Sequence, residues 1–401
     1  MSSSVAIIDV GRTKFGEHYE TNPEKLVEEA FLNASIKPEI SRKDLDACKF
    51  STYFLPQTNK IGAPEGFVSQ LMEINIPMEA SYKPFSSAFS AAYDSIKSGR
   101  YNLVLVGGME KMTDRWYKIR DDLMLLGCPL SYYTGATPLT NHELMLREYI
   151  KKYDIHDKEL EEFNNALAWM SVVNHKNALK NENAQFREEI FEKEISVDDV
   201  LRARGRKPLG RYDFAPVSDG ASALLLASEE VAKKYTDKPV YVSGIGSATD
   251  FISYQSRNER TGFLSNRLAM EKALKKSGLE REEIKLLEIH DESTMQGMVS
   301  LEDLGFAEKG KAWLDINKSC EDYQGFYKIN GNKLFVNRKG GLKADGNPLG
   351  ATGGAQIYEI VKQLRAEAGE RQINEKLEHG LVLENEGFGV KSNIIILSVV
   401  K

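Results

Sequence analysis

The sequence of 401 residues contains few cysteines, and their arrangement supports neither a metal site nor a disulfide framework. The three cysteines, Cys48, Cys128 and Cys320, are widely spaced, and no CxxC pair exists. A zinc site or a disulfide-stapled fold would need such pairs. The six histidines show no HExxH spacing, which would mark a helix-borne zinc site. We therefore expect no metal.

The sequence also lacks a long apolar run, a basic leader and an excess of positive charge. No stretch approaches the roughly 20 apolar residues that span a bilayer. Residues 1–5 show no basic stretch followed by an apolar core. The formal net charge of −6 gives no support for a nucleic-acid or membrane-surface partner. We expect a cytoplasmic protein without either partner.

The remaining composition is that of a globular protein with more than one core. Hydrophobic residues make up 41% of the chain and charged residues 28%, a balance typical of ordinary folded domains. A chain of 401 residues is longer than one hydrophobic core usually supports. We expect two fused units, residues 1–240 and residues 241–401.

Apolar runs typical of buried strands alternate with helical patterns along the chain. This alternation indicates an α/β fold, in which helices cover both faces of a parallel-rich sheet. Loop, helix, strand and glycine turn occur in that order at 82–108 and again at 347–389. The repeat is consistent with an internal duplication or with the ordinary order of any α/β chain. Strands are expected at 5–10, 103–106, 221–227, 283–289, 380–383 and 393–399, and helices at 23–34, 85–98, 267–277 and 352–365.

Residues from about 115 to 210 differ from the rest of the chain. They are rich in charge, asparagine and helix formers, and they contain few β-branched runs. This composition predicts a helical insertion, or loop domain, that lies over a sheet domain.

The stretch 340–356 is rich in glycine and contains a proline. Such a composition predicts an irregular loop that reaches residue 350 and is followed by a helix. Backbone amides of a glycine-rich loop can approach a ligand closely. The helix that follows makes the loop a candidate ligand site at a helix N-terminus. An ordinary surface loop is the alternative.

A second stretch, residues 286–294, carries a histidine where an apolar strand ends. His290 follows the strand expected at 283–289. Active-site residues of α/β sheets often lie at this end of a strand. His290 is therefore a catalytic candidate, and a purely structural histidine is the alternative.

Four motifs together resemble those of the thiolase family, in its sterol-carrier-protein-type and archaeal branch. The sequence GGMEKM at 107–112 is similar to the family's GGxEKM, and PVSDGA at 216–221 is similar to its PVSDGA. HDEST at 290–294 is similar to HDxFT, and 340–356 resembles GGLxxxGHPxGATGxAQ. The order and spacing of the motifs agree along essentially the whole chain.

This resemblance implies the thiolase fold: two similar βαβαβαββ halves packed as a five-layer αβαβα sandwich with a helical loop domain. It implies a homodimer or homotetramer that binds an acyl-CoA thioester as substrate or ligand, with no other cofactor. Relatives in this branch work beside a small OB-fold, zinc-ribbon protein, which is therefore a candidate partner. The resemblance makes Gly346, Gly350 and Ser218 candidates for contact with the acyl-CoA.

The chain departs from the family pattern at the catalytic positions. Without gaps, Tyr82 stands where the family has its nucleophilic cysteine, and a phenol with a pKa near 10 is barely ionised at neutral pH. Asn347 stands where the family has the histidine of GHP, and an amide cannot act as a base. The late segment 383–389 contains no cysteine where the family has a second one. None of the three cysteines lies in a matching motif.

His290 and Asn347 are similar to the His/Asn pair of ketoacyl-synthase-type and hydroxymethylglutaryl-CoA-synthase-type enzymes. Such a pair donates two hydrogen bonds to a thioester carbonyl and stabilises an enolate or oxyanion. We take Tyr82, His290 and Asn347 as the catalytic candidates, with Tyr82 as a proton donor or pocket wall. The alternative is that the pair is a relic in a pocket without turnover. Available carboxylates are Asp291, Glu384 and Glu386.

Three functions remain open from the sequence. The first is an enzyme that makes or breaks a carbon–carbon bond in an acyl-CoA without an acyl-cysteine. The second is a non-catalytic thiolase-like subunit that gives structure to a complex with an OB-fold partner. The third is an ordinary acetyl-CoA C-acetyltransferase, which would need the catalytic groups that the motifs lack.

Overall fold

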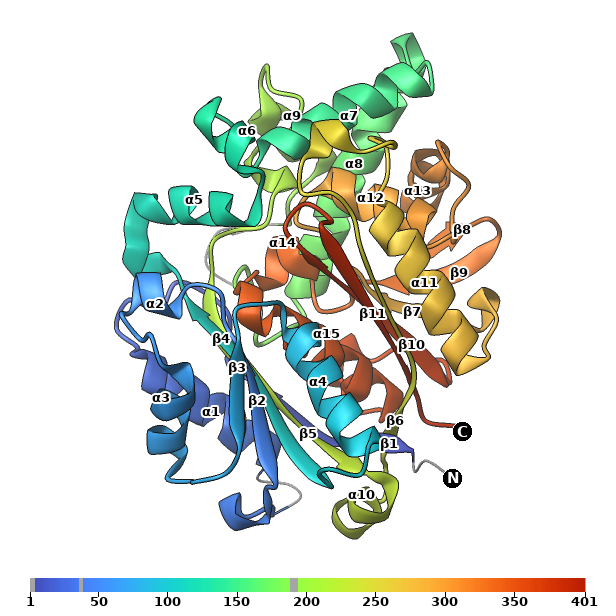
Figure 1. Ribbon diagram of the computed structural model, residues 1–401. Coiled ribbons are helices and arrows are strands. Elements are labelled where there is room, and N and C mark those ends of the chain that lie inside the picture. The colour runs from blue at the N-terminus through green and yellow to red at the C-terminus, as the bar shows by residue number, and fades with distance from the viewer. Residues whose placement is uncertain (1–3, 36–38, 188–193, 401) are drawn as a thin grey trace.

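The first half of the chain runs through five strands, with helices between the first four of them. The computed structural model describes residues 4–35, 39–187 and 194–400. Figure 1 shows this half in the lower left of the molecule. Its elements are β1 (Val5–Arg12), α1 (Pro23–Ser35), β2 (Ala47–Ser51), α2 (Leu55–Thr58), α3 (Pro64–Met72), β3 (Met78–Ser81), α4 (Phe85–Lys97), β4 (Leu103–Lys111) and β5 (Asp219–Ser228).

The second half repeats this order after α10 (Glu229–Tyr235) and adds a short hairpin. Its strands are β6 (Val240–Thr249), β7 (Leu286–Glu288), β8 (Tyr327–Ile329), β9 (Asn332–Val336), β10 (His379–Glu386) and β11 (Lys391–Ser398). Its helices are α11 (Leu264–Ser277), α12 (Thr294–Asp303), α13 (Ala312–Cys320), α14 (Gly341–Asp345) and α15 (Leu349–Leu364).

The strand order is the same in the two halves. The sheet runs β3-β2-β4-β5-β1-β6-β11-β10-β7-β9-β8. When strands are numbered within each half and the added β8 is set aside, both halves read 3-2-4-5-1. Within the sheet, the two halves join where Ala6 and Ile7 of β1 pair with Tyr241 and Val240 of β6. The prediction of two similar halves is therefore confirmed, and the repeated motif order reflects a repeated unit.

Two helices, α4 and α15, pack side by side between the two half-sheets. Their apolar residues, among them Phe85, Phe89, Ile357 and Ile360, share one core with strands of both halves. Helices α1 and α3 cover the other face of the first half-sheet. Helices α11, α12 and α13 cover the other face of the second. The resulting layers, helix–strand–helix–strand–helix, confirm the predicted thiolase-like sandwich.

The chain between β4 and β5 is a helical insertion that packs on the opposite half. Its longest helix, α8, contacts α12, α13 and α14 of the second half. Within the described ranges, none of the helices has the length and apolar character that a bilayer crossing requires. The α-helices of the insertion are α5 (Ile119–Asp122), α6 (Pro129–Tyr133), α7 (Thr140–Lys152), α8 (Asp157–Ala178) and α9 (Val197–Arg204).

The glycine-rich stretch is more regular than its composition predicts. The expectation of an irregular loop up to residue 350 is wrong, because α14 occupies Gly341–Asp345 and α15 begins at Leu349. The loop is also buried and anchored: Asp345 lies 3.0 Å from Arg12 Nη1 and 2.9 Å from Lys339 Nζ. Arg12 comes from a distant part of the chain, so local glycine content did not reveal its pairing with Asp345.

The motifs GGMEKM and PVSDGA lie next to each other because β4 pairs with β5. Lys111 Nζ lies 3.1 Å from Asp219 Oδ2, and Asp219 also accepts a hydrogen bond from Thr113 N at 2.9 Å. Glu110 accepts hydrogen bonds from the backbone N–H groups of Tyr53 and Phe54. Burial raises the pKa of Glu110 to about 8, and these hydrogen bonds oppose that rise. Both motifs therefore fix the chain around Tyr53.

A single buried carboxylate joins the beginnings of α4 and α15. Glu384, near the end of β10, accepts hydrogen bonds from Ser86 N at 2.7 Å and from Gly353 N at 2.8 Å. Backbone N–H groups in the first turn of a helix lack partners within the helix and favour negative charge. Burial nevertheless raises the pKa of Glu384 to about 7. Glu384 thus positions both central helices against β10.

The Gly353→Ala substitution tests this anchoring. A Cβ at position 353 would overlap the Glu384 carboxylate, so the helix or the carboxylate must move. Overpacking of this kind costs about 1–3 kcal/mol, and chemical denaturation should show a loss of that size. Gly66→Ala is the matched control, because Gly66 lies in α3 and its added Cβ meets nothing within 4 Å. Equal losses in the two variants would contradict the anchoring role.

Candidate functional site

A small cavity lies where the insertion meets the two halves. Its volume is about 60 Å³, which is room for about two water molecules. Polar and apolar groups contribute about equally to its wall, and three of the titratable side chains that line it are His142, His290 and Glu292. The other side chains that line it include Tyr53, Pro84, Leu123, Met124, Leu126, Cys128, Leu349, Asn385 and Phe388.

The segment that follows β7 supplies two of the three titratable groups. In an extended chain, alternate side chains lie on opposite sides. His290 and Glu292 line the cavity, and Asp291 between them bonds elsewhere. It accepts hydrogen bonds from Leu342 N at 2.7 Å and from Asn174 Nδ2 at 2.6 Å. Asp291 therefore ties the end of β7 to α14 and α8.

His290 is buried, with 4% of its surface exposed. Within the described part of the chain, its Nδ1 has no hydrogen-bond partner. Burial lowers the pKa of His290 to about 4, although the charge of Glu292 acts in the opposite direction. The imidazole is therefore neutral at pH 7, with one N–H to donate and one nitrogen to accept. A buried polar group without a partner is costly and indicates a place for a ligand.

Glu292 lies in the cavity wall opposite a second histidine. His142 Nε2, on α7, is 3.7 Å from Glu292 Oε2. His142 Nδ1 is 2.8 Å from Ser293 Oγ, and its ring packs edge-on against Phe388 at 4.6 Å. Burial would raise the pKa of Glu292, but the hydrogen bond and charge of His142 and the charge of His290 bring it below its usual value.

Cys128 is the cysteine that the structure brings into this cavity. Hydrogen bonds from the Ser131 backbone lower the pKa of its thiol, with further bonds from Leu130 and Ser253. These N–H and O–H groups hold the thiol, and none of them is an imidazole base. Cys48 and Cys320 lie in apolar cores, where burial raises the pKa of each thiol to about 12.

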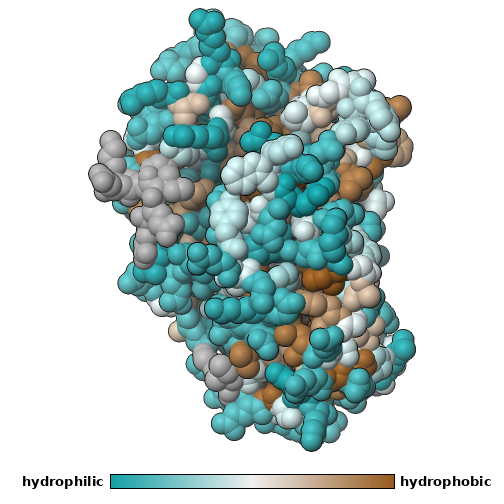
Figure 2. Space-filling view, turned by 90° about the vertical axis from the view of Figure 1, so that its left-hand side faces the viewer, coloured by the Kyte–Doolittle hydropathy of each residue, from teal (hydrophilic) through white to brown (hydrophobic). Residues whose placement is uncertain are grey.

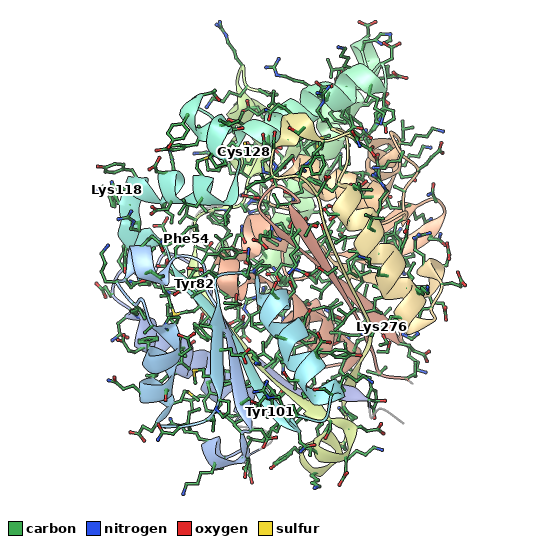
Figure 3. The ribbon with its side chains drawn as sticks, viewed as in Figure 1. Phe54, Tyr82, Tyr101, Lys118, Cys128 and Lys276 are labelled. Carbon is green, nitrogen blue, oxygen red and sulfur yellow. The ribbon has the colours of Figure 1, made fainter. Side chains whose placement is uncertain are left out.

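Tyr82 does not line the cavity. It follows β3 with 45% of its surface exposed, and its hydroxyl lies 3.5 Å from Gly62 O. In the view of Figure 3, Tyr82 lies below Cys128. Pro84, two residues further along, is the part of this turn that reaches the cavity. The structure thus does not bring Tyr82 together with His290.

Asn347 lies two residues before α15 and is buried, and it is not among the residues that line the cavity. Its side-chain Oδ1 accepts a hydrogen bond from Thr352 Oγ1 at 2.8 Å, and its backbone N donates to Ser218 Oγ at 2.9 Å. Among the described residues, its Nδ2 makes no hydrogen bond. Leu349, two residues later, lines the cavity. The amide is therefore oriented with its donor group unused.

The three candidates for acyl-CoA contact lie in packed surroundings outside the cavity lining. Ser218 Oγ donates to Gln185 Oε1 at 2.6 Å besides accepting from Asn347. A Cβ on Gly346 would lie 2.9 Å from Phe15 Cβ, and one on Gly350 would lie 2.9 Å from Ser51 O. Each of the three therefore has a packing role in the structure, and their contact with a ligand stays a prediction.

None of the three carboxylates singled out from the sequence lines the cavity. Asp291 and Glu384 hold helices and strands together, and Glu386 pairs with Lys83 at 2.6 Å. Glu292 does line it and was missed, although it stands inside the motif at 290–294. The two-residue spacing from His290 was the available signal. Within the described ranges, no cluster of three side chains suits a metal ion.

Comparison with known families decides the relationship. Residues 5–230 match the family model described as thiolase, N-terminal domain, and residues 246–399 match thiolase C-terminal domain-like. The chain belongs to the thiolase family. It is 32% identical, over 98% of its length, to an acetyl-CoA acetyltransferase of Methanothermobacter thermautotrophicus, and it covers 99% of that protein. This thiolase-family chain is also 34% identical, over 59% of its length, to sterol carrier protein 2 of Oryctolagus cuniculus, covering 42% of it.

Solved structures agree with the fold of this thiolase-family protein. The chain matches the structure named Ltp2-ChsH2(DUF35) aldolase with a TM-score of 0.78 and 21% identity, covering 98% of this chain and 97% of that one. It matches a monomeric SCP2-thiolase like protein from Mycobacterium smegmatis with a TM-score of 0.73 and 17% identity, covering 100% of this chain and 78% of that one. The predicted branch, archaeal and sterol-carrier-protein-type, is confirmed.

The neutral state of His290 can be measured directly. Burial should keep the ring uncharged as the pH falls, so NMR titration should show one histidine with a pKa near 4. Its signal should disappear in the His290→Gln variant. His156 serves as the internal control, because a hydrogen bond to the Asp154 backbone and the charge of Asp154 raise its pKa. A His290 resonance that titrates near 6.5 would contradict the desolvated site.

Proposed function

We propose that this thiolase-family protein binds an acyl-CoA thioester and makes or breaks a carbon–carbon bond next to the thioester. In this proposal no acyl-cysteine forms at position 82. The carrying observation is His290, a neutral, buried imidazole with an unused nitrogen in a small cavity. A thioester carbonyl oxygen would accept a hydrogen bond from this ring, and charge developing on the oxygen would strengthen that bond.

Asn347 is proposed as the second donor to the same oxygen. Thr352 engages its Oδ1, which supports a role for Nδ2 as a donor. Two such donors favour an enolate or oxyanion, and this chemistry requires no cysteine. Aldol-type cleavage, decarboxylation and direct condensation all pass through such a charge. Because the Tyr82 side chain is 45% exposed and its hydroxyl lies beside Gly62 O, the proposal gives it no part in polarising the carbonyl.

The small volume of the cavity favours a short acyl group. Pockets for drug-sized ligands usually measure about 300–1,000 Å³, whereas this cavity has about 60 Å³. Its apolar wall of Tyr53, Leu123 and Leu349 suits the methyl or methylene carbon of such a group. We therefore take acetyl-CoA as the first ligand to test.

A non-catalytic subunit in a complex is the second candidate function. The similar structure named Ltp2-ChsH2(DUF35) aldolase carries two protein names, which favours a partner protein. The partner proposed for this chain is an OB-fold, zinc-ribbon protein that would help to hold the CoA. An ordinary acetyl-CoA C-acetyltransferase is the third candidate, and the names of the archaeal relatives favour it.

A cytoplasmic homodimer or homotetramer is part of the proposal. The strand β3 ends the sheet, and its residues are partly or fully exposed. An open strand edge tends to pair with another chain unless it is protected. Figure 2 shows hydrophobic residues gathered over the lower half of the side on which α3 lies. Half-buried apolar side chains at this edge include Ile61, Phe67, Leu71, Ile76 and Met78.

Turnover and binding should respond differently to substitutions at His290 and Tyr82. We expect acetyl-CoA to raise the melting temperature, and acetyl-CoA with acetoacetyl-CoA to give measurable loss of thioester. The His290→Leu variant should lose turnover by about 100- to 1,000-fold, the usual effect of removing one oxyanion donor. Tyr82→Phe, the control, should retain turnover within about threefold, because its hydroxyl lies outside the cavity lining.

Two results would decide against this function. Binding of both thioesters without turnover would contradict the enzyme and favour the non-catalytic subunit. Turnover that survives in the His290→Leu variant would show that groups other than His290 polarise the thioester carbonyl.

A further inference from the structure

Carbon–carbon bond formation beside a thioester needs a base as well as a carbonyl donor, and the positions that hold the family's bases provide none here. The proton on the carbon next to the carbonyl must be removed before that carbon can attack. The family's histidine of GHP is Asn347 here, and Asn385 lies in the segment that lacks the late cysteine. The side chain of Asn385 is already engaged in hydrogen bonds: its Nδ2 donates to Asn266 Oδ1 at 2.8 Å, and its Oδ1 accepts from Gln296 Nε2 at 3.0 Å.

Glu292 is the carboxylate that lines the cavity together with His290. Both side chains line this one cavity, although the strand ends at Glu288 and the chain bends at Glu292. A carbonyl donor lies about 3 Å from the oxygen, and a base lies at a similar distance from the carbon that loses the proton. A thioester bound in this cavity would therefore have His290 as a donor and Glu292 as a base beside it.

His142 holds this carboxylate from the insertion. Its ring is fixed by Ser293 Oγ on Nδ1 and by Phe388 on its face, and its Nε2 faces Glu292 Oε2 at 3.7 Å. Only 1% of the His142 side chain is exposed, compared with 27% for Glu292. The carboxylate is thus open to a ligand on one side and supported on the other.

We propose that Glu292 is the base that removes the α-proton of the bound acyl-CoA, with His142 as its positioning residue. The proposal rests on the function proposed above. The Glu292 carboxylate takes the proton, and the electrons of the broken C–H bond form the carbon–carbon double bond of an enolate. The negative charge moves to the thioester oxygen, where the N–H of His290 stabilises it. Return of a proton from Glu292 regenerates the thioester.

The ionisation of the site agrees with this assignment. Burial would raise the pKa of Glu292, but the hydrogen bond and charge of His142 act most strongly against it and keep that pKa below the usual value; His290 adds to this effect only where it is protonated. The base is therefore ionised at neutral pH and ready to accept a proton. His290, with its pKa lowered to about 4, is the neutral donor over the same pH range.

Hydrogen–deuterium exchange of acetyl-CoA isolates this step from bond formation. The full-length protein is incubated with acetyl-CoA in D2O, and deuterium in the acetyl group is followed by NMR or mass spectrometry. The unchanged protein should catalyse exchange. Glu292→Gln should reduce the rate at least about 100-fold, the scale of general-base catalysis, while acetyl-CoA binding changes less than about twofold. Glu386→Gln is the matched control, because Glu386 pairs with Lys83 outside the cavity lining.

The positioning role of His142 can be tested separately, through the pH dependence of the exchange. Because His142 helps to lower the pKa of Glu292, His142→Gln should raise that pKa. The acid limb of the exchange pH profile should then move to higher pH, an effect that loss of packing alone would not produce. An unchanged acid limb would remove His142 from the proposal.

The remaining outcomes separate this inference from the function on which it rests. Exchange that persists in Glu292→Gln would overturn the assignment of Glu292 and leave the proposed function standing. Binding of acetyl-CoA to the unchanged protein without exchange would also overturn the assignment of Glu292. If the unchanged protein fails to bind acetyl-CoA, the proposed function itself fails for this ligand.

Discussion

The buried carboxylate of Glu384 joins three layers of the molecule at one point. It accepts hydrogen bonds from the first turns of α4 and α15 and lies near the end of β10. A buried charge or buried carboxyl group is costly unless hydrogen bonds surround it, and the two helix N-termini provide them. The close approach requires glycine at 353. Asn385, Gly387 and Phe388, which line the cavity, follow Glu384 directly in the chain.

The same geometry explains why the active positions of the family can change while the fold stays. The motifs at 107–112 and 216–221 hold each other through Lys111 and Asp219, so their retention reflects strand pairing. Tyr82 sits outside the cavity on an exposed turn, where an aromatic side chain is tolerated without disturbing α4. The cavity itself holds a desolvated histidine and a carboxylate, a combination suited to proton transfer.

Much of the fold, but only part of the site, could be predicted from sequence. The alternation of strand and helix patterns and four motifs predicted the two halves. The position of His290 at the end of an apolar strand made it a candidate site residue. Glu292 was missed because three other carboxylates were weighed without their partners, which only the tertiary structure reveals. His142 and Cys128 reach the cavity from the insertion, and no local pattern marks them. The stretch before residue 350 was predicted as irregular from its glycine content. Its anchor, the pairing of Asp345 with Arg12, lies far away in sequence and could not be seen there.

The central claim is that this thiolase-family site works on a thioester without forming an acyl-cysteine. Intact-protein mass spectrometry after incubation with acetyl-CoA tests it most directly, with rapid acid quenching to preserve a thioester-linked acyl group. The account predicts an unmodified protein mass under conditions in which acetyl-CoA undergoes exchange. An acyl adduct that maps to Cys128, the thiol in the cavity, and that disappears in Cys128→Ser would contradict the account and favour an acyl-cysteine enzyme with a relocated nucleophile.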